Sequence, residues 1–330
     1  MRVYITNING QAASSTAQLC QNMVTDIAVS LGYRELGIYA YNMKSDSPSE
    51  LSKRIDGIIA GIRPGDVVIF QSPTWNTTAF DVKLMEKLKL YQIKIIIFIH
   101  DVVPLMFAGN EYLMEPTIAY YNQADVIIAP SQAMVDHLRR DGLTVSKVIL
   151  QEMWDHPSSV PQKEAHFQKL LHFPGSPERF PFVQNWSYPT KLRVYAWQET
   201  KLPEAVERYA FRPDQQLLME MSEGGFGLVW ADDDAKSYHQ LTCQYKLGTF
   251  LAAGIPVIAQ KGIAGHRLIE ANHLGFLVDD LEEACHIVEH MTDDDYQNLV
   301  GSVRQFSPLV RQGYFSRRLL TEAVFQALCH

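Results

Sequence analysis

Short apolar runs that alternate with helical patterns constrain the fold of this chain most strongly. The runs are rich in Val and Ile, and several are apolar throughout, as strands buried on both faces are. Because parallel strands need a crossover helix between them, the alternation predicts an α/β fold with a parallel, right-handed, doubly wound sheet. In the first half, strands are expected at Val3–Ile8, Leu36–Tyr41, Val67–Phe70, Lys94–Ile99, Val126–Ala129 and Lys147–Leu150. Helices are expected at Ala17–Leu31, Pro48–Ala60, Thr77–Leu90, Met114–Gln123 and Ser131–Arg140, the last with Ser131 as N-cap.

The same rhythm starts again after a polar, proline-containing linker over residues 151–169. Strands are expected there at Lys169–Phe173, Lys191–Trp197, Phe226–Trp230, Ile255–Ala259 and Gly275–Val278. Helices are expected at Pro203–Arg208, Gln215–Met221, Tyr238–Ala253, Gly265–Asn272, Leu281–Met291, Asp293–Gln305 and Tyr314–Leu328.

A chain of 330 residues suits two domains of this kind. We place them at residues 1–160 and 161–312, as two Rossmann-like domains that face each other across a cleft. Residues 313–330 form a last helix with no strand after it. We expect that helix to pack across the other domain or in an oligomer interface.

Composition excludes several classes of partner. The net charge of −8 argues against nucleic acid or an anionic membrane as a general partner. The four cysteines are scattered without metal-ligand spacing, which favours reduced thiols. The longest apolar run, Ile95–Ile99, is too short to span a bilayer, and no apolar leader precedes the first strand. We therefore expect a soluble, cytoplasmic protein.

The stretch Tyr238–Gln260 carries the strongest local signal for a site. Gly254 is placed to end the helix as a left-handed cap, and a short buried strand follows Pro256. Polar residues gather on the opening turns, where backbone N–H groups and the helix dipole favour an anion. They are Gln244, Tyr245, Lys246 and Thr249. The alternative is an ordinary packing unit with a solvated lysine.

Other candidates in the second half are less specific. Arg179 follows a glycine turn after the strand Lys169–Phe173 and suits a phosphate, although, taken alone, a surface carboxylate is the more common partner. Phe211 could stack on a base or fill a core. The acidic run Asp232–Asp234 could bind a metal, but such loops are more often solvated, so no metal is predicted.

Three loops at strand ends are candidates in the first half. The polar loop Asn9–Thr16, which includes Gly10, could cover a ligand or only cap its helix; it lacks the GxGxxG pattern of dinucleotide sites. Trp75 could stack on a sugar or pack internally. His100 and Asp101 end the fourth strand, where Asp101 could act as a general base or could cap its loop.

The segment from Lys246 to Ala259 resembles the helix–Gly-x-Pro-Val-Ile segment of GT-B glycosyltransferases. From end to end, the chain resembles the bacterial glucosyltransferases that extend O-linked N-acetylglucosamine (GlcNAc) on serine-rich repeat adhesins. The Asn9–Thr16 loop, His100-Asp101, Arg179 and Lys246 carry this narrower resemblance.

The resemblance implies UDP-glucose as the donor substrate, no cofactor, and a GlcNAc-bearing serine-rich repeat protein as the acceptor. By the same likeness, Arg179 and Lys246 grip the diphosphate and Phe211 lies near the nucleotide, where we expect relatives often to carry tyrosine. Tyr245 and Thr249 are further candidates for donor binding. The loop with Asn9, Gly10 and Thr16 would close over the site, and the protein would be a homo-oligomer, with a tetramer as one form.

One departure bears on mechanism. Many retaining GT-B enzymes carry two glutamates where this chain has Leu241 and Thr249. The anomeric outcome therefore stays open, and an inverting reaction would assign the base to Asp101, with His100 next. Two other functions are alternatives: a non-catalytic GT-B-like partner of another glycosyltransferase, and a nucleotide-sugar epimerase, for which the sequence offers no glutamate and histidine pairs.

Overall fold

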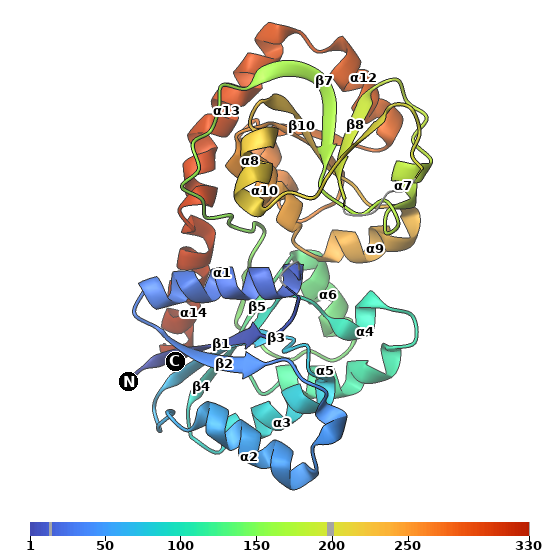
Figure 1. The fold of residues 1–330 in the computed structure, drawn as a ribbon. Coiled ribbons are helices and arrows are strands. Elements are labelled where there is room, and N and C mark those ends of the chain that lie inside the picture. Colours follow the sequence, from blue (N-terminus) through green and yellow to red (C-terminus); the bar gives the residue numbers. More distant parts are fainter. Residues whose placement is uncertain (13–14, 197–200, 330) are drawn as a thin grey trace. The chain divides into compact units, whose positions relative to one another are not determined.

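The computed structural model describes residues 1–12, 15–196 and 201–329, and for residues 233–236 it describes the backbone alone. The chain divides into two compact units (Figure 1). The first unit consists of residues 1–151 together with 316–330, and the second of residues 152–315. The sequence placed the boundaries after residues 160 and 312, so the chain leaves the first unit earlier and returns to it slightly later than predicted.

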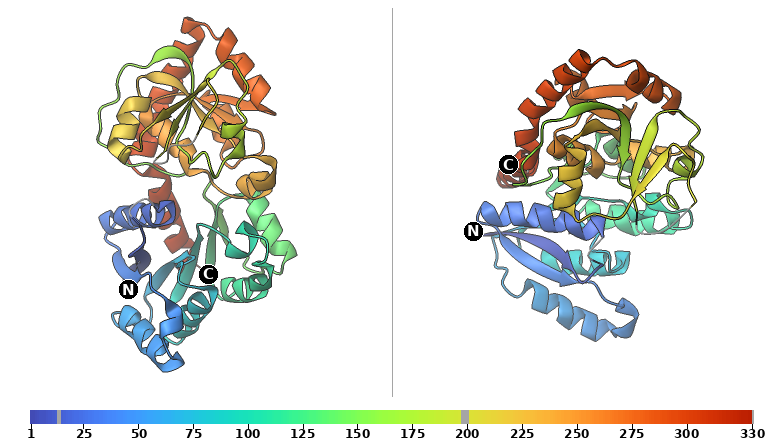
Figure 2. Two further views of the ribbon diagram at one scale, coloured as in Figure 1. Left: turned by 45° about the vertical axis from the view of Figure 1, so that its right-hand side comes forward. Right: turned by 45° about the horizontal axis from the view of Figure 1, so that its top comes forward.

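The first unit is a six-stranded parallel sheet in the order β2-β1-β3-β4-β5-β6. Its strands are β1 (Val3–Asn9), β2 (Arg34–Tyr39), β3 (Val67–Ser72), β4 (Lys94–Ile99), β5 (Val126–Ala129) and β6 (Val148–Leu150). Its helices are α1 (Thr16–Ser30), α2 (Pro48–Ile59), α3 (Thr78–Lys89), α4 (Val103–Met106), α5 (Met114–Tyr121), α6 (Gln132–Arg140) and α14 (Tyr314–Leu328), with short 3₁₀ turns η1 (Met43–Ser45) and η2 (Glu111–Leu113). Helices α2, α3 and α5 lie on one face of the sheet and α1 lies on the other, as a doubly wound sheet requires (Figures 1 and 2).

The second unit repeats this plan with a parallel sheet in the order β12-β11-β10-β7-β8-β9. Its strands are β7 (His166–Phe173), β8 (Lys191–Tyr195), β9 (Val206–Tyr209), β10 (Gly224–Val229), β11 (Val257–Gln260) and β12 (Gly275–Val278). Its helices are α7 (Pro181–Gln184), α8 (Asp214–Met221), α9 (Asp233–Leu241), α10 (Tyr245–Ala253), α11 (His266–Ala271), α12 (Leu281–His290) and α13 (Asp293–Arg311). Helices α8, α10 and α13 pack together on one face (Figure 1).

Two predicted helices in the second unit are wrong. The edge strand β9, residues 206–209, overlaps the last three residues of the expected helix Pro203–Arg208, because Val206 is buried and the segment pairs in parallel with β8. The expected helix Tyr238–Ala253 is broken into α9 and α10 at residues 242–244. The side-chain amide of Gln244 stabilises the break by donating to His239 O at 2.8 Å and Thr242 Oγ1 at 2.8 Å.

Helix α14 belongs to the first unit, where its Leu319, Leu320 and Ala323 are fully buried. Lys147 Nζ donates to the carbonyl oxygens of Gln326, at 2.8 Å, and Cys329, at 2.5 Å. A cation at a helix C-terminus satisfies carbonyls that the helix itself leaves unpaired. Across the described residues, no helix has the length and apolar character needed to cross a membrane.

Candidate active site

The start of helix α10 positions the predicted anion site. Leu247, Phe250 and Leu251 are fully buried and fix the helix on the sheet. Gly248 allows close contact with the segment before β7, because a Cβ on Gly248 would lie 2.4 Å from the carbonyl oxygen of Trp154. The break before α10 places Tyr245 and Lys246 on its first turn, and Gly254 ends the helix in the left-handed conformation with φ 87°, as predicted.

Lys246 is half-buried against two aromatic rings. Its Nζ lies 4.6 Å from the ring centroid of Phe180 and 4.9 Å from that of Phe173. Within the described part of the chain, no carboxylate forms an ion pair with it. Burial, and then the charge of Arg179, lowers the pKa of Lys246 to about 8. Among the described side chains, the ammonium therefore has no carboxylate that neutralises it.

Arg179 shares this site. It lies in the loop between β7 and α7, is exposed, and has its guanidinium carbon 5.7 Å from the ring centroid of Phe180. The surface carboxylate partner that was the alternative for Arg179 is absent from the described residues. The structure therefore brings Arg179 and Lys246 together around Phe180; we call these two residues the cation pair. Two adjacent, unneutralised cations can bind a diphosphate.

His239, on α9, is a neighbour of the cation pair that sequence reasoning missed. Burial, and then the charge of Lys246, lowers the pKa of His239 to about 3, so the ring is neutral at pH 7. Its Nδ1 is enclosed and has no hydrogen-bond partner among the described residues. Its position in the stretch Tyr238–Gln260 was the available signal, but a histidine on a predicted helix does not by itself indicate a ligand.

Tyr245 and Thr249 lie beside a buried histidine on the same helix face. The ring of Tyr245 stacks near that of His156, with centroids 5.3 Å apart. His156 Nδ1 lies 3.1 Å from Thr249 Oγ1, and His156 Nε2 lies 3.0 Å from Asp214 Oδ2. Thr249 is buried and also donates to Tyr245 O at 3.2 Å. These bonds fix the helix start; contact of Tyr245 or Thr249 with a donor stays a prediction.

Phe211 and the acidic run have different surroundings. Phe211 is 37% exposed in the loop between β9 and α8, where the predicted role near a nucleotide stays untested. Asp232 accepts a hydrogen bond at 3.3 Å from the backbone N–H of Phe182, which opens α7. The side chains of Asp233 and Asp234 lie outside the described residues. Among the residues that are described, no group of three His, Cys, Asp or Glu side chains could hold a metal ion.

The loop after β1 is described in part. Gly10 has φ 86°, and a Cβ there would lie 2.6 Å from ring carbons of Tyr39, so a side chain at this position would be strained and would displace the Tyr39 ring. Asn9 is the last residue of β1, and Thr16 opens α1 directly after its N-cap Ser15. Residues 13 and 14 lie outside the described residues, and the role of Asn9, Gly10 and Thr16 over a ligand stays a prediction.

His100 and Asp101 follow β4, as expected. His100 is buried, its ring lies 4.8 Å from that of Phe98, and burial lowers its pKa to about 3. Such a histidine is a poor proton acceptor at pH 7. Asp101 is half-buried, and its charge adds to burial in raising the pKa of the Cys20 thiol. Of the two predicted bases, Asp101 is therefore the chemically better candidate.

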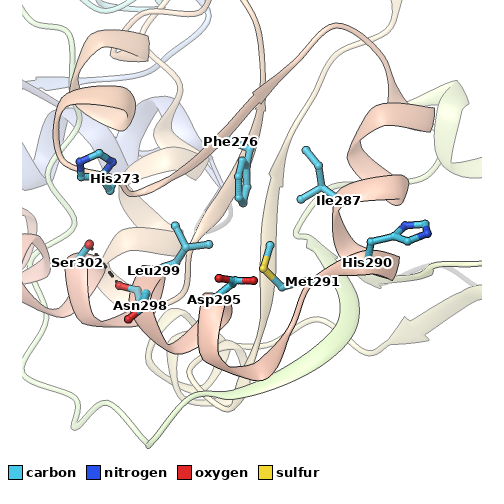
Figure 3. A pocket seen from close by; sticks show the side chains of 9 residues that line it. All are labelled: His273, Phe276, Ile287, His290, Met291, Asp295, Asn298, Leu299 and Ser302. Atoms are coloured by element: carbon cyan, nitrogen blue, oxygen red, sulfur yellow. Dashed lines mark hydrogen bonds between the residues drawn. The ribbon is translucent and has the colours of Figure 1, made fainter.

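A pocket of about 550 Å³ lies elsewhere in the second unit (Figure 3). Phe276, Ile287, Met291 and Leu299 point into it, while His273 and His290 lie at opposite sides (Figure 3). It contains none of the predicted site residues, and it is formed by edge strand β12 with α12 and α13.

Known structures share this fold over nearly the whole chain. A sucrose-phosphate synthase from Thermosynechococcus elongatus has a TM-score of 0.66 at 13% identity, covering 99% of this chain and 100% of that one. An alpha-glucosyltransferase (AGT) solved with UDP has a TM-score of 0.64 at 14% identity, covering 98% and 100%. HepE from Anabaena, solved with UDP-glucose, has a TM-score of 0.63 at 14% identity, covering 97% and 99%. Two doubly wound parallel sheets, matched over nearly the whole chain by these structures, define the GT-B fold.

Sequence comparison narrows this class to one family. The model of the Glucosyltransferase 3-like N-terminal domain matches residues 2–153, and that of the C-terminal domain matches residues 171–323. The chain therefore belongs to the Glucosyltransferase 3-like family. It is 65% identical over 329 residues to Glucosyltransferase 3 of Streptococcus parasanguinis, covering 100% of both chains. It is 49% identical over 335 residues to Glucosyltransferase 3 of Streptococcus gordonii, covering 99% of this chain and 100% of that one.

Proposed function

We propose that this glycosyltransferase transfers glucose from UDP-glucose to O-linked GlcNAc on a serine-rich repeat glycoprotein in the cytoplasm. The cation pair carries the proposal, because two positive charges without a carboxylate partner among the described side chains, 4.6 Å and 5.7 Å from the ring of Phe180, suit a nucleoside diphosphate. The relatives named Glucosyltransferase 3, and the structural neighbours solved with UDP or UDP-glucose, support the same donor.

In the proposed reaction, the bond between glucose C1 and the diphosphate oxygen breaks as the acceptor hydroxyl oxygen bonds to C1. Negative charge develops on the departing UDP, and Arg179 and Lys246 stabilise it without a metal ion. The neutral ring of His239 beside Lys246 adds no third charge at pH 7. The acceptor hydroxyl releases its proton, and we assign that proton to the Asp101 carboxylate if the reaction inverts C1.

UDP release by the purified chain tests this function. UDP-glucose with a GlcNAc-bearing serine-rich peptide should give acceptor-dependent UDP, whereas the same peptide without the sugar should not. Arg179→Ala or Lys246→Ala removes one charge-assisted contact, so UDP affinity should fall roughly tenfold or more.

Matched controls are Arg304→Ala and Lys169→Ala, which remove exposed cations of the second unit, Lys169 being paired with Glu289. Unaltered UDP affinity in both cation-pair variants would show that the phosphate site lies elsewhere. The alternative function, a non-catalytic partner of another glycosyltransferase, predicts no UDP release by this chain alone; the unneutralised cation pair argues against it.

A further inference from the structure

The loop after β3 is held tightly on both sides of Trp75. Before Trp75, Gln21 Nε2 donates to Pro73 O at 2.8 Å, and both residues are buried. Thr74 Oγ1 donates to the buried carboxylate of Asp81 at 2.5 Å. The residue that precedes Trp75 is therefore fixed by a short hydrogen bond inside the protein.

After Trp75, the side chain of Asn76 ties the loop to the chain that follows β2. Its Oδ1 accepts from the backbone N–H of Tyr41 at 3.1 Å, and its Nδ2 donates to Tyr39 O at 3.4 Å. With Thr74 and Asn76 both anchored, the backbone between them has little freedom.

Two features of Trp75 are unfavourable for the stability of the folded protein. Its φ is 59°, a left-handed conformation that a bulky residue rarely adopts. Its indole Nε1 is enclosed, with no hydrogen-bond partner among the described residues. The side chain is half-buried, and no other described aromatic ring packs on it. Glycine would avoid both costs and a smaller apolar residue would avoid the second, so the fold alone gives no reason for tryptophan here.

The position of this loop indicates a ligand. Strand β3 lies in the sheet between β1 and β4, and the loop follows its carboxyl end, the end at which such sheets bind ligands (Figure 1). The neighbouring loop carries the candidate base Asp101, and the two strand ends are joined because His100 N donates to Ser72 O at 2.8 Å. Because Nε1 is enclosed, any part of the ring that meets solvent is carbon.

We infer that Trp75 is the platform on which the sugar ring of the acceptor stacks, an acceptor-binding residue on the strand-end loop next to that of Asp101. This assignment of Trp75 rests on the proposed glycosyl transfer. The C–H face of a pyranose matches the apolar face of an indole, and stacking leaves the sugar hydroxyls at the ring edge free to reach a base. The strained backbone is then a feature that holds the ring toward the ligand.

Kinetics of three variants test the assignment. Trp75→Leu should raise the KM for the GlcNAc-peptide about five- to tenfold and leave the Kd for UDP unchanged. Trp75→Phe keeps a ring and should stay within about threefold of wild type. Trp75→Gly relieves the positive φ, so it provides a second ring-free variant if Trp75→Leu folds poorly.

Gln92→Gly is the matched control for the backbone change. Gln92 also has a positive φ, 52°, but it precedes β4 and so lies at the amino ends of the strands, opposite the loop of Trp75. It should leave the KM for the peptide unchanged.

An unchanged KM for the peptide in both Trp75→Leu and Trp75→Gly would overturn the inference. A lower Tm of Trp75→Gly in the same experiment would indicate that Trp75 is a packing residue instead. Wild-type chain without acceptor-dependent UDP release would instead defeat the proposed function. In that case, calorimetry compares binding of the GlcNAc-peptide to the wild type and to Trp75→Leu. Weaker binding to the variant supports the assignment of Trp75. Equal affinity, or no binding to either chain, overturns it.

Discussion

Lys246 should make UDP binding dependent on pH above about pH 8. Burial and the charge of Arg179 lower its pKa from 10.5 to about 8. This shift corresponds to a cost of about 3 kcal/mol for keeping the ammonium in the folded protein. Between pH 8 and 10.5, the unfolded chain holds a proton that the folded chain has lost, so the free energy of unfolding rises with pH there. Below pH 8 the full cost is present.

The variant Lys246→Met removes the charge and keeps a flexible chain against Phe173 and Phe180. It relieves the cost of about 3 kcal/mol and loses two cation–π contacts of about 0.5–1 kcal/mol each. The net gain in the free energy of unfolding at pH 7 should be about 1–2 kcal/mol, which raises the Tm of a unit of this size by about 2–8 °C. A thermal scan of the chain without UDP measures this gain.

The affinity for UDP should change in the opposite direction. A bound diphosphate favours the charged form of Lys246, so binding above pH 8 must take up a proton. The Kd of the wild type should be constant near pH 7 and rise about tenfold per pH unit above 8. The terminal phosphate of UDP, with a second pKa of about 6, is already ionised there, and His239 is neutral throughout.

Calorimetry between pH 7 and 9.5, in buffers of different ionisation enthalpy, counts the proton directly. Lys246→Met should bind UDP more weakly, without proton uptake and without the pH slope. Lys169→Met, an exposed control, should match the wild type. A wild-type Kd that is flat from pH 7 to 9.5, or a Lys246→Met chain with a lower Tm, would refute the reasoning.

Four further outcomes are expected. Asp101→Asn is nearly isosteric but cannot accept a proton, so turnover should fall roughly 10²–10⁴-fold with unchanged UDP affinity; near-normal turnover would end the assignment of the base. Activity should survive EDTA, and complete loss with rescue by manganese or magnesium would revive the Asp232–Asp234 loop as a metal site. Gly248→Ala should lower both Tm and UDP affinity, because its Cβ would lie 2.4 Å from Trp154 O and displace the start of α10; a variant unchanged in both would contradict this. Light scattering should show a homo-oligomer, as the 67% exposed Phe325 on α14 favours, whereas a clean monomer at micromolar concentration would count against it.

Buried strands were predictable because their composition leaves few alternatives. The run Lys94–Ile99 was predicted with its observed bounds, since five consecutive buried apolar residues suit only a strand covered on both faces. The edge strand Val206–Tyr209 was not predictable in the same way, because its short alternating pattern becomes a strand only through pairing with β8. The break at residues 242–244 contains no glycine or proline, and a hydrogen bond from Gln244 determines it.

The two cations of the candidate site could be named from the sequence, but the side chains around them could not. Arg179 and Lys246 were chosen from the glycine turn and the helix start, and the structure places both near Phe180. The ring between them and the burial that lowers the pKa of Lys246 depend on packing of segments far apart in the chain. His239 was missed for the same reason, since only the tertiary structure encloses its ring.

The return of the chain to the first unit has a consequence for the order in which the protein folds during synthesis. Residues 152–315 are continuous, so the second unit can fold as soon as α13 has left the ribosome. The first unit starts earlier but finishes later, because Lys147 finds its carbonyl partners only when residues 326 and 329 have been made. Until then the buried side chains of Leu319, Leu320 and Ala323 are missing from the first unit, which stays incomplete. The nascent chain therefore has an aggregation-prone interval that ends with its last helix.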